Sequence, residues 1–182
     1  MAEVAPRDLR IDVSDILDNL ADSIDAEFDA VLEPIVVGTE SFVPLAPAHI
    51  DITLTYAGTA IVAQGEVTVE LQAVCSRCLQ EFALPMTTQI DGFYVRPGTE
   101  DELPEDQDFE LIDDRFIDVL PAVRSAIVVE LPFAPLHDPD CAGICPMCGK
   151  DLATGQCACE PDVSTSPFAG LKDLLAQKSG DA

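Results

Sequence analysis

The stretch His49-Ile-Asp-Ile-Thr-Leu-Thr-Tyr56 decides the fold class, because apolar and polar residues alternate along its whole length. Such alternation puts the apolar side chains on one face of a β-strand. The pattern continues after a turn at Ala57-Gly58 in residues 60–63, 66–74 and 82–95, with Gln64-Gly65 separating the first two segments. Strands joined by tight turns indicate antiparallel hairpins rather than βαβ units. We therefore expect an antiparallel β-meander or a barrel-like sheet in an α+β fold.

Toward the N-terminus, residues 1–39 are expected to form an extension with a helix and a strand. Helical spacing relates Val13, Ile16, Leu17 and Leu20, and Asp12 or Ser14 would cap this helix. Residues 24–30 instead alternate apolar residues with acids, which favours a strand. A longer helix over Leu20, Ile24, Phe28 and Val31 fits as well, so residues 21–36 stay open between helix and strand. We prefer a short helix followed by a strand.

Toward the C-terminus, two helices are expected to flank the sheet. Asp118 would cap a helix over roughly residues 119–130, with Pro121 in its first turn and Leu131-Pro132 after its end. Its apolar stripe would be Val119, Leu120, Val123, Ile127 and Val128. A last helix would begin at Ser166-Pro167, with an apolar face of Phe168, Leu171, Leu174 and Leu175. The predicted domains are the extension 1–39, a β core over residues 40–136, and a cysteine-rich zinc-knuckle module with the last helix over residues 137–182.

The charge balance restricts the partners of this chain. Its 182 residues include 34 acids and 9 bases, which give a formal net charge of −25. A broad grip on a nucleic-acid backbone needs clustered Lys and Arg, so this composition argues against it and favours basic partners. Ten acids lie between Glu100 and Asp118 beside one base, Arg115. The acidic segment 97–110 is therefore either a solvated loop or a docking surface for a basic partner.

The sequence predicts a cytoplasmic protein with reduced cysteines. It contains no apolar run of transmembrane length, and Met1 to Arg10 lack the apolar core of a signal peptide. The seven cysteines are an odd number, and their spacings are those of metal ligands.

The segment Cys145-Pro-Met-Cys148-Gly-Lys150 predicts a zinc knuckle. Two cysteines separated by two residues can bind one ion, because the turn between them directs both sulfurs inward. Gly149 allows the positive φ that such a turn often needs. Cys157 and Cys159 would complete a tetrahedral site of four thiolates, which is typical of structural Zn²⁺.

Four further candidate ligands remain, Cys75, Cys78, His137 and Cys141. Seven cysteines and one histidine make two sets of four, so we expect a second zinc site. Cys75 and Cys78 could instead be buried thiols or a redox pair, and His137 could be a surface loop residue. An iron–sulfur cluster is the other metal alternative. His49 has no ligand neighbours along the chain and is expected to be structural.

The order of these motifs resembles the YceD-like family. The resemblance covers roughly residues 40–178 and rests on Cys75-Ser-Arg-Cys78-Leu79, Ile117-Asp118-Val119, Leu131-Pro132, Cys141-Ala-Gly-Ile-Cys145-Pro-Met-Cys148-Gly-Lys-Asp-Leu152, Cys157-Ala-Cys159 and Pro167-Phe168-Ala169-x-Leu171. Many relatives carry a cysteine in place of His137, and others keep the His137-Asp138 pair and lack the Cys-Pro-x-Cys-Gly module, which fits two separable sites. The acidic stretch 97–110 and the segment 1–39 depart from the family pattern.

The resemblance implies a non-enzymatic, zinc-binding ribosome-biogenesis factor that supports synthesis, processing or stability of large-subunit (23S) ribosomal RNA. The charge adds that it would handle a basic ribosomal protein, or touch the RNA locally through Arg77 and Lys150 beside the cysteine turns. Taken alone, each of these residues is more often a solvated surface base. The alternatives are a zinc-ribbon nucleic-acid-binding protein and a metal-dependent RNA-processing protein, although no HExxH or paired-carboxylate motif stands out among the acids. We expect neither a membrane nor a small-molecule substrate as partner.

Overall fold

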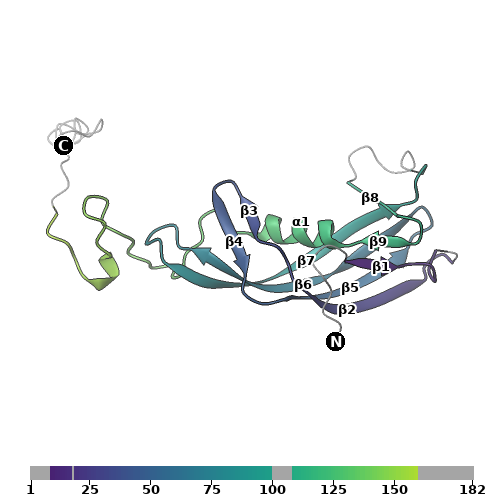
Figure 1. Cartoon of the computed structure of the whole chain (residues 1–182), viewed down its shortest axis with the longest axis horizontal. Helices are drawn as coiled ribbons and strands as arrows, with labels where there is room; N and C mark the ends of the chain where they lie inside the picture. The colour runs from purple at the N-terminus through teal and green to yellow at the C-terminus, as the bar shows by residue number, and fades with distance from the viewer. Residues whose placement is uncertain (1–8, 18, 100–107, 160–182) are drawn as a thin grey trace, which may run out of the picture. The chain divides into compact units, whose positions relative to one another are not determined.

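The computed structural model describes residues 9–17, 19–99 and 108–159, which fall into two units, residues 1–137 and residues 138–182. Among the described residues, the first unit contains nine strands and one α-helix (Figure 1). They are β1 (Arg10–Asp12), β2 (Ser23–Ala30), β3 (Ile35–Val37), β4 (Glu40–Pro44), β5 (Ala48–Tyr56), β6 (Ala60–Val74), β7 (Glu81–Val95), β8 (Glu110–Leu111), β9 (Phe116–Asp118) and α1 (Leu120–Glu130).

The main sheet is antiparallel and open. β6 pairs with β5 along one edge and with β7 along the other, and this second pairing runs from Ala60↔Val95 to Val74↔Glu81. β2 lies outside β5, and β4 takes over the β5 edge of β6 at Val43↔Gln72. β8 is a parallel addition to β7. The expected antiparallel meander is confirmed, but the sheet is not barrel-like within the described residues, because its edge strands do not pair with one another. Residues of α1 and of the separate two-stranded sheet β1–β9 pack into its core instead.

The expected break at Gln64-Gly65 is wrong, because β6 runs through both residues. Gly65 lies opposite Ile52 in the β5–β6 ladder. A Cβ on Gly65 would lie 2.1 Å from the Asp51 carbonyl oxygen and 2.7 Å from the Ile52 Cα. The glycine therefore permits a close approach of the β5 backbone instead of ending the strand.

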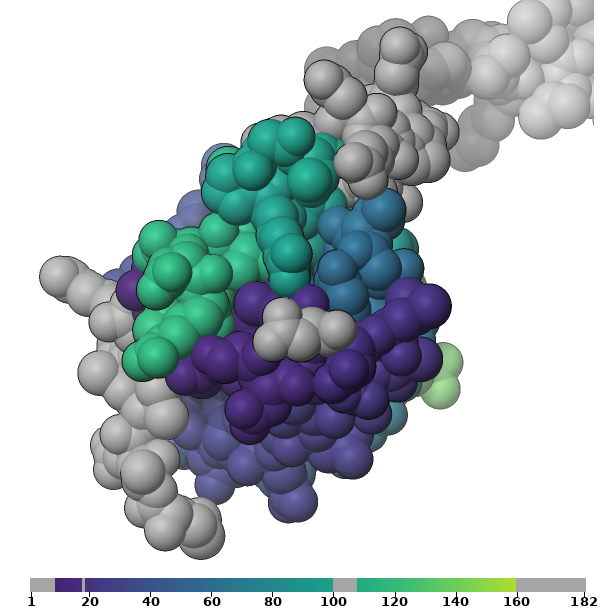
Figure 2. Space-filling model, turned by 90° about the vertical axis from the view of Figure 1, so that its right-hand side faces the viewer, coloured from purple at the N-terminus to yellow at the C-terminus, as the bar shows by residue number. Residues whose placement is uncertain are grey.

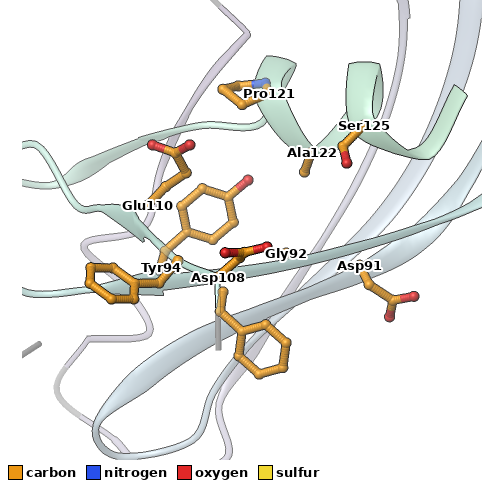
Figure 3. A pocket seen from close by; sticks show the side chains of 10 residues that line it. Asp91, Gly92, Tyr94, Asp108, Glu110, Pro121, Ala122 and Ser125 are labelled. Atoms are coloured by element: carbon orange, nitrogen blue, oxygen red, sulfur yellow. The ribbon is translucent and has the colours of Figure 1, made fainter. Parts of the chain in front are cut away.

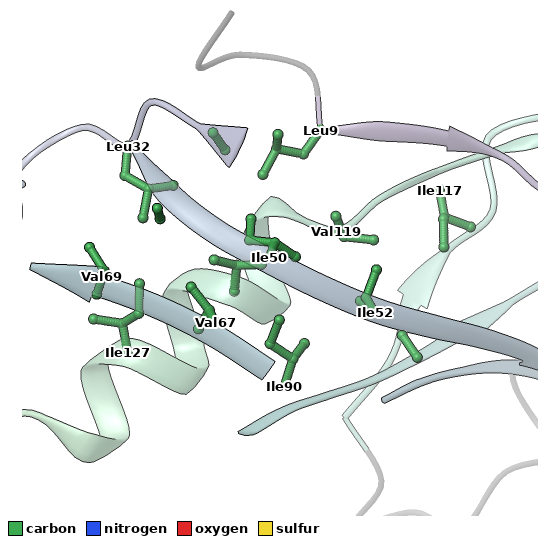
Figure 4. Close-up of a cluster of buried hydrophobic side chains, with 14 of the residues drawn as sticks. Leu9, Leu32, Ile50, Ile52, Val67, Val69, Ile90, Ile117, Val119 and Ile127 are labelled. Atoms are coloured by element: carbon green, nitrogen blue, oxygen red, sulfur yellow. The ribbon is translucent and has the colours of Figure 1, made fainter. Parts of the chain in front are cut away.

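The core lies between the apolar face of the sheet and α1 (Figure 4). Along β5, the alternation seen in the sequence becomes alternating burial, and Ile50, Ile52 and Leu54 are fully buried. From α1, Val123 and Ile127 point into the same core, whereas Val128 is exposed, contrary to the predicted stripe. The helix boundaries agree with the prediction to within one residue.

Asp118 supports the start of α1, although the N-cap residue itself is Val119. The Asp118 carboxylate Oδ1 accepts a hydrogen bond of 2.9 Å from the backbone N–H of Leu120. This satisfies one of the donors that a helix N-terminus leaves without an intrahelical partner. Leu131 ends the helix as expected.

The predicted helix around residues 13–20 is wrong. In the described residues, this segment forms turns in which the N–H of Ile16 donates to the carbonyl of Val13 at 3.1 Å. The preceding residues form β1, which pairs with β9 in a separate two-stranded sheet, and this pairing fixes the chain where the turns begin. Figure 2 shows these purple N-terminal residues beside the green residues around β9. The apolar side chains of Val13 and Ile16 still reach the core from turns.

Residues 23–30 form the strand β2. Of the two conformations left open for this segment, the strand is therefore correct and the longer helix is wrong. Its whole length pairs with β5, from Ser23↔Thr55 to Ala30↔Ala48. A second strand, β3, follows after Pro34. The long-range partner β5 therefore decides the local conformation of a segment whose apolar spacing fits either period.

In the second unit, the described residues form turns and a short 3₁₀-helix, Leu152–Thr154. The carboxylate of Asp151 caps this helix by accepting from the N–H of Ala153 at 2.8 Å. The expected helix from Ser166 and the acidic residues 100–107 lie outside the described residues. In the part of the chain that is described, no helix is long and apolar enough to cross a membrane.

Candidate metal centres

The cysteine knuckle of the second unit forms as the sequence predicts. The N–H of Gly149 donates to the carbonyl of Cys145 at 2.8 Å, and the N–H of Cys145 donates to the carbonyl of Lys150 at 2.8 Å. Gly149 has φ of 70°, the left-handed conformation for which glycine is suited. These two hydrogen bonds close the turn between the cysteines.

The turn brings four sulfurs together. The sulfurs of Cys145, Cys148, Cys157 and Cys159 all lie within 4.8 Å of one another. Hydrogen bonds from the backbone N–H groups of Cys148 and Met147 lower the pKa of Cys145 to about 6. The neighbouring Cys148 sulfur and burial raise the pKa of Cys159 to about 12. One thiol of the set thus ionises easily while the last resists, because adjacent thiolates repel one another unless a cation lies between them.

A second knuckle joins β6 to β7. It runs from Cys75 to Gln80 and has the same two closing hydrogen bonds, Leu79 N–H to the Cys75 carbonyl at 2.9 Å and Cys75 N–H to the Gln80 carbonyl at 2.8 Å. Leu79 stands where Gly149 stands in the other turn and has φ of 61°. The longest hairpin of the sheet therefore ends in a cysteine turn.

The segment around His137 lies against this turn. The N–H of Ser76 donates to the carbonyl of Pro135 at 2.8 Å, and the rings of Phe82 and His137 meet edge to face with centroids 6.4 Å apart. His137 Nδ1 lies 3.3 Å from the Cys78 sulfur. Ligand atoms of Cys75, Cys78, His137 and Cys141 all lie within 4.8 Å of one another.

The environment of Cys75 favours its thiolate. Burial alone would raise its pKa, but hydrogen bonds from the backbone N–H groups of Cys78 and His137, joined by the His137 ring, outweigh burial and lower the pKa to about 5. All three cysteines of this group are buried and His137 is exposed. A set of three sulfurs and one imidazole nitrogen has the composition of a structural zinc site.

The structure thus brings the eight candidate ligands together in two groups of four, with the membership expected from their spacing. Arg77 lies exposed within the Cys75–Gln80 knuckle. Lys150 follows the Cys145–Cys148 knuckle and donates from Nζ to the carbonyl of Gln156 at 3.1 Å. His49 belongs to neither group and instead pairs with Asp29 on the neighbouring strand, Nδ1 to Oδ1 at 2.9 Å.

Two features of the site are not visible in the sequence pattern. The Pro135 carbonyl fixes the position of the His137 segment, and Leu79 adopts a conformation that usually marks glycine. The contact of the Pro135 carbonyl is made by the backbone, so it does not depend on a recognisable residue type in the sequence. The conformation of Leu79 could have been predicted by comparing the two cysteine pairs. Leu79 and Gly149 each follow the second cysteine of a pair, so a positive φ at one position indicates a positive φ at the other.

These observations define a class of protein: an open antiparallel sheet whose long hairpin ends in one cysteine turn, followed by a second cysteine turn nearby in the chain. The chain belongs to the YceD family, because the model described as "Large ribosomal RNA subunit accumulation protein YceD" matches residues 63–175. The resemblance seen in the motifs is therefore confirmed.

Mycobacterial proteins are among the relatives. Uncharacterised proteins of Mycobacterium bovis and Mycobacterium tuberculosis are each 29% identical over 129 residues, which cover 69% of this chain and 62% of theirs. An uncharacterised protein of Mycobacterium leprae is 27% identical over 133 residues, 72% of this chain and 60% of that protein. The chain thus spans about three fifths of the length of these relatives. No solved structure shows significant similarity to it.

Proposed function

We propose that each of the two groups binds one Zn²⁺. The first group offers four thiolates and the second three thiolates and an imidazole, and both sets close a tetrahedron without a position for substrate. The low pKa values of Cys75 and Cys145 support binding near neutral pH, since the thiolate is the ligand. In each site the ion would have a structural role, because it would fix a turn that two backbone hydrogen bonds otherwise close.

The protein that carries these ions is proposed to be a non-enzymatic, cytoplasmic factor that supports synthesis, processing or stability of large-subunit ribosomal RNA. The family match over residues 63–175 is the observation that carries this proposal. The closed ligand sets add to it, because a hydrolytic zinc needs an open position and an adjacent base.

A basic ribosomal protein is the proposed direct partner. The formal net charge of −25 opposes wide contact with RNA and favours contact with a basic protein. Acids also face one another on the described surface, since Glu27 on β2 lies directly opposite Asp51 on β5. Like charges at paired positions repel, and a cationic partner would relieve this.

Complementation tests the function. In a strain that lacks its own copy, the wild-type chain should restore the ratio of large- to small-subunit ribosomal RNA. Variants that lose both groups of ligands should not restore it. Normal RNA levels with a metal-free variant would overturn the zinc-dependent function, and normal levels in the deletion strain itself would overturn the role in RNA accumulation.

Pull-down at low and high salt, followed by mass spectrometry, tests the partner. Neutralising Glu100, Asp101, Glu102, Glu105 and Asp106, all outside the described residues, should slow association with a basic partner most at low salt. The same proteins retrieved by this variant and by wild type would exclude acidic docking through these residues.

The alternative is direct RNA binding through the knuckles, or metal-dependent processing of the RNA. The exposure of Arg77 and its place in a turn closed by hydrogen bonds favour this alternative. A salt titration of RNA binding discriminates between them, because a phosphate grip gives a steep dependence on salt. A steep slope that Arg77→Gln and Lys150→Gln reduce would support the alternative.

A further inference from the structure

A cavity of about 330 Å³ lies in the first unit beside the start of α1 (Figure 3). Its walls come from the end of β7, from β8 with the two residues before it, and from the first turns of α1. This volume is at the lower end of the range of small-ligand sites, which are about 300–1,000 Å³. The cavity is therefore large enough for one side chain of a partner.

Tyr94 lines this cavity and is fully buried. Its hydroxyl points toward the start of α1 (Figure 3) and has no hydrogen-bond partner among the described residues. Buried polar groups nearly always have a partner, because leaving one unpaired costs free energy. This hydroxyl is therefore a candidate contact for a group that enters from outside.

Gly92 and Ala122 are the small residues that line the cavity beside Tyr94. A Cβ on Gly92 would lie 3.2 Å from the Tyr94 oxygen, 3.1 Å from its ring carbon Cε2 and 3.3 Å from the Ala122 Cβ. Any larger side chain at Gly92 would press on the Tyr94 ring. Gly92 and Ala122 thus pack closely around the covered Tyr94 hydroxyl with no side chain larger than a methyl group.

The walls of the cavity are acidic. Among the described residues, the lining includes Asp91, Asp108 and Glu110 and no basic residue. The Asp91 carboxylate points away from Tyr94 (Figure 3), so Asp108 and Glu110 are the acids beside it. Burial, together with the charges of Asp118 and Glu110, raises the pKa of Tyr94, so its hydroxyl keeps its proton and its lone pairs can accept. Phe109 adds an aromatic ring that is 39% exposed. Acids, a lone-pair acceptor and an aromatic ring together suit an organic cation.

A metal ion fits this cavity poorly. Among the described residues, the groups of ligand atoms within 4.8 Å of one another are the two cysteine clusters, and the cavity carboxylates form no such group. A cation with its charge on an extended stem can reach separated acids, while its stem lies on the apolar lining. Lysine and arginine side chains have this construction.

We propose that the cavity receives a lysine or arginine side chain from a segment of a basic protein partner, with the Tyr94 hydroxyl accepting one of its N–H groups and Glu110 neutralising its charge. This inference rests on the proposed function in one respect, that the partner is a basic protein. It names the place where one side chain of that partner would be held.

Titration of the zinc-loaded full chain with a short peptide tests this directly. The peptide is acetylated and amidated and alternates lysine and arginine with glycine, and its matched control carries acetyl-lysine and citrulline instead. NMR should show the largest amide shifts at Gly92, Tyr94 and Ser125 with the charged peptide and none with the control. Equal binding of the two peptides, or shifts centred elsewhere, would overturn the proposal.

Variants separate a defined site from general attraction. Glu110→Gln should weaken binding of the peptide by about threefold to tenfold, the range for one charge-assisted contact at a partly exposed site. Glu70→Gln, an exposed acid on β6 outside the cavity, makes the same change in charge and should leave affinity within about twofold. Equal losses for both would show that only net charge attracts the peptide and would overturn the cavity assignment.

Tyr94→Phe supplies a second readout. This substitution should weaken binding of the charged peptide. It should leave the melting temperature unchanged or raised, because it removes a buried hydroxyl without an internal partner. A lowered melting temperature with unchanged affinity would contradict the proposal. Spermidine binding more tightly than the peptide would identify a free polyamine as the occupant and would also overturn it.

The two proposals can fail separately. Peptide binding at the cavity needs no ribosomal RNA, so it would survive a failure of the complementation experiment. Conversely, a chain that restores ribosomal RNA levels but does not bind the peptide would support the proposed function and would exclude this cavity as a binding site for a basic side chain.

Discussion

Leu79 and Gly149 occupy the same position in two cysteine turns, and both have positive φ, 61° and 70°. Each donates its N–H to the carbonyl of the first cysteine of its pair. Glycine adopts this conformation without strain, whereas a residue with a Cβ pays about 1 kcal/mol or more. The two turns have the same backbone, but one carries a residue poorly suited to it.

Leu79→Gly should therefore stabilise the zinc-loaded protein by about 1 kcal/mol. The Leu79 side chain is 63% exposed, so little packing is lost with it. Thermal unfolding in the presence of zinc measures the effect. Gly149→Ala is the matched opposite change, because no atom lies within 4 Å of the added Cβ and the cost is conformational alone. A lower melting temperature for Leu79→Gly would show that its side chain contributes more than its backbone strain costs.

Elemental analysis of purified protein without a tag should give two Zn²⁺ per chain. The expectation rests on eight ligands in two groups of four. A ratio near one would remove one of the proposed sites. Brown protein that contains iron and sulfide in place of zinc would favour an iron–sulfur cluster.

Cys148→Ser and Cys78→Ser should each lose one ion, with unequal effects on stability. In the second unit, Cys148→Ser should loosen the segment around residues 141–159 and leave the sheet folded. Cys78→Ser should cost about 3 kcal/mol, because its group links residues 59 apart in sequence, Cys78 and His137, and closing that loop is entropically expensive. Circular dichroism melts of both variants provide the comparison, and equal losses would contradict the separate roles of the two sites.

His49 should make a pH-dependent contribution to stability. Its hydrogen bond with Asp29, joined by the charges of Asp29, Glu27 and Asp51, raises its pKa above the ordinary value of 6.5. A raised pKa in the folded state means that the stabilisation is complete below about pH 6.5 and is lost as pH rises through the folded-state pKa. NMR titration of the ring should give the raised pKa, and His49→Gln should remove the corresponding slope of melting temperature against pH. A ring that titrates at or below 6.5 would exclude the effect.

The sequence predicts best where one signal dominates. Alternation over residues 49–56 leaves no competing period, and the strand β5 forms there. The cysteine groups were predictable because a ligand pair in a short turn is a local feature with a strict spacing.

Prediction fails where distant residues decide. Val13 and Ile16 have helical spacing, yet the pairing of β1 with β9 sets the chain direction before them, and turns bring both side chains to the core. Gly65 resembles a strand breaker, but its lack of a Cβ serves the approach of β5. The Tyr94 cavity combines residues from β7, β8 and α1, and no short window of sequence contains them together.

The β6–β7 hairpin has one further consequence. Its ladder pairs 15 residues of β6 with 15 of β7, with the Cys75–Gln80 turn at its tip and Tyr94 near its opposite end. At about 3.3 Å per residue, the ladder holds these two features roughly 45 Å apart along the strand. The hairpin thus fixes the distance between the cysteine turn and the Tyr94 cavity. A compact ligand can occupy only one of these two places, and a single molecule that contacts both must be extended over that length.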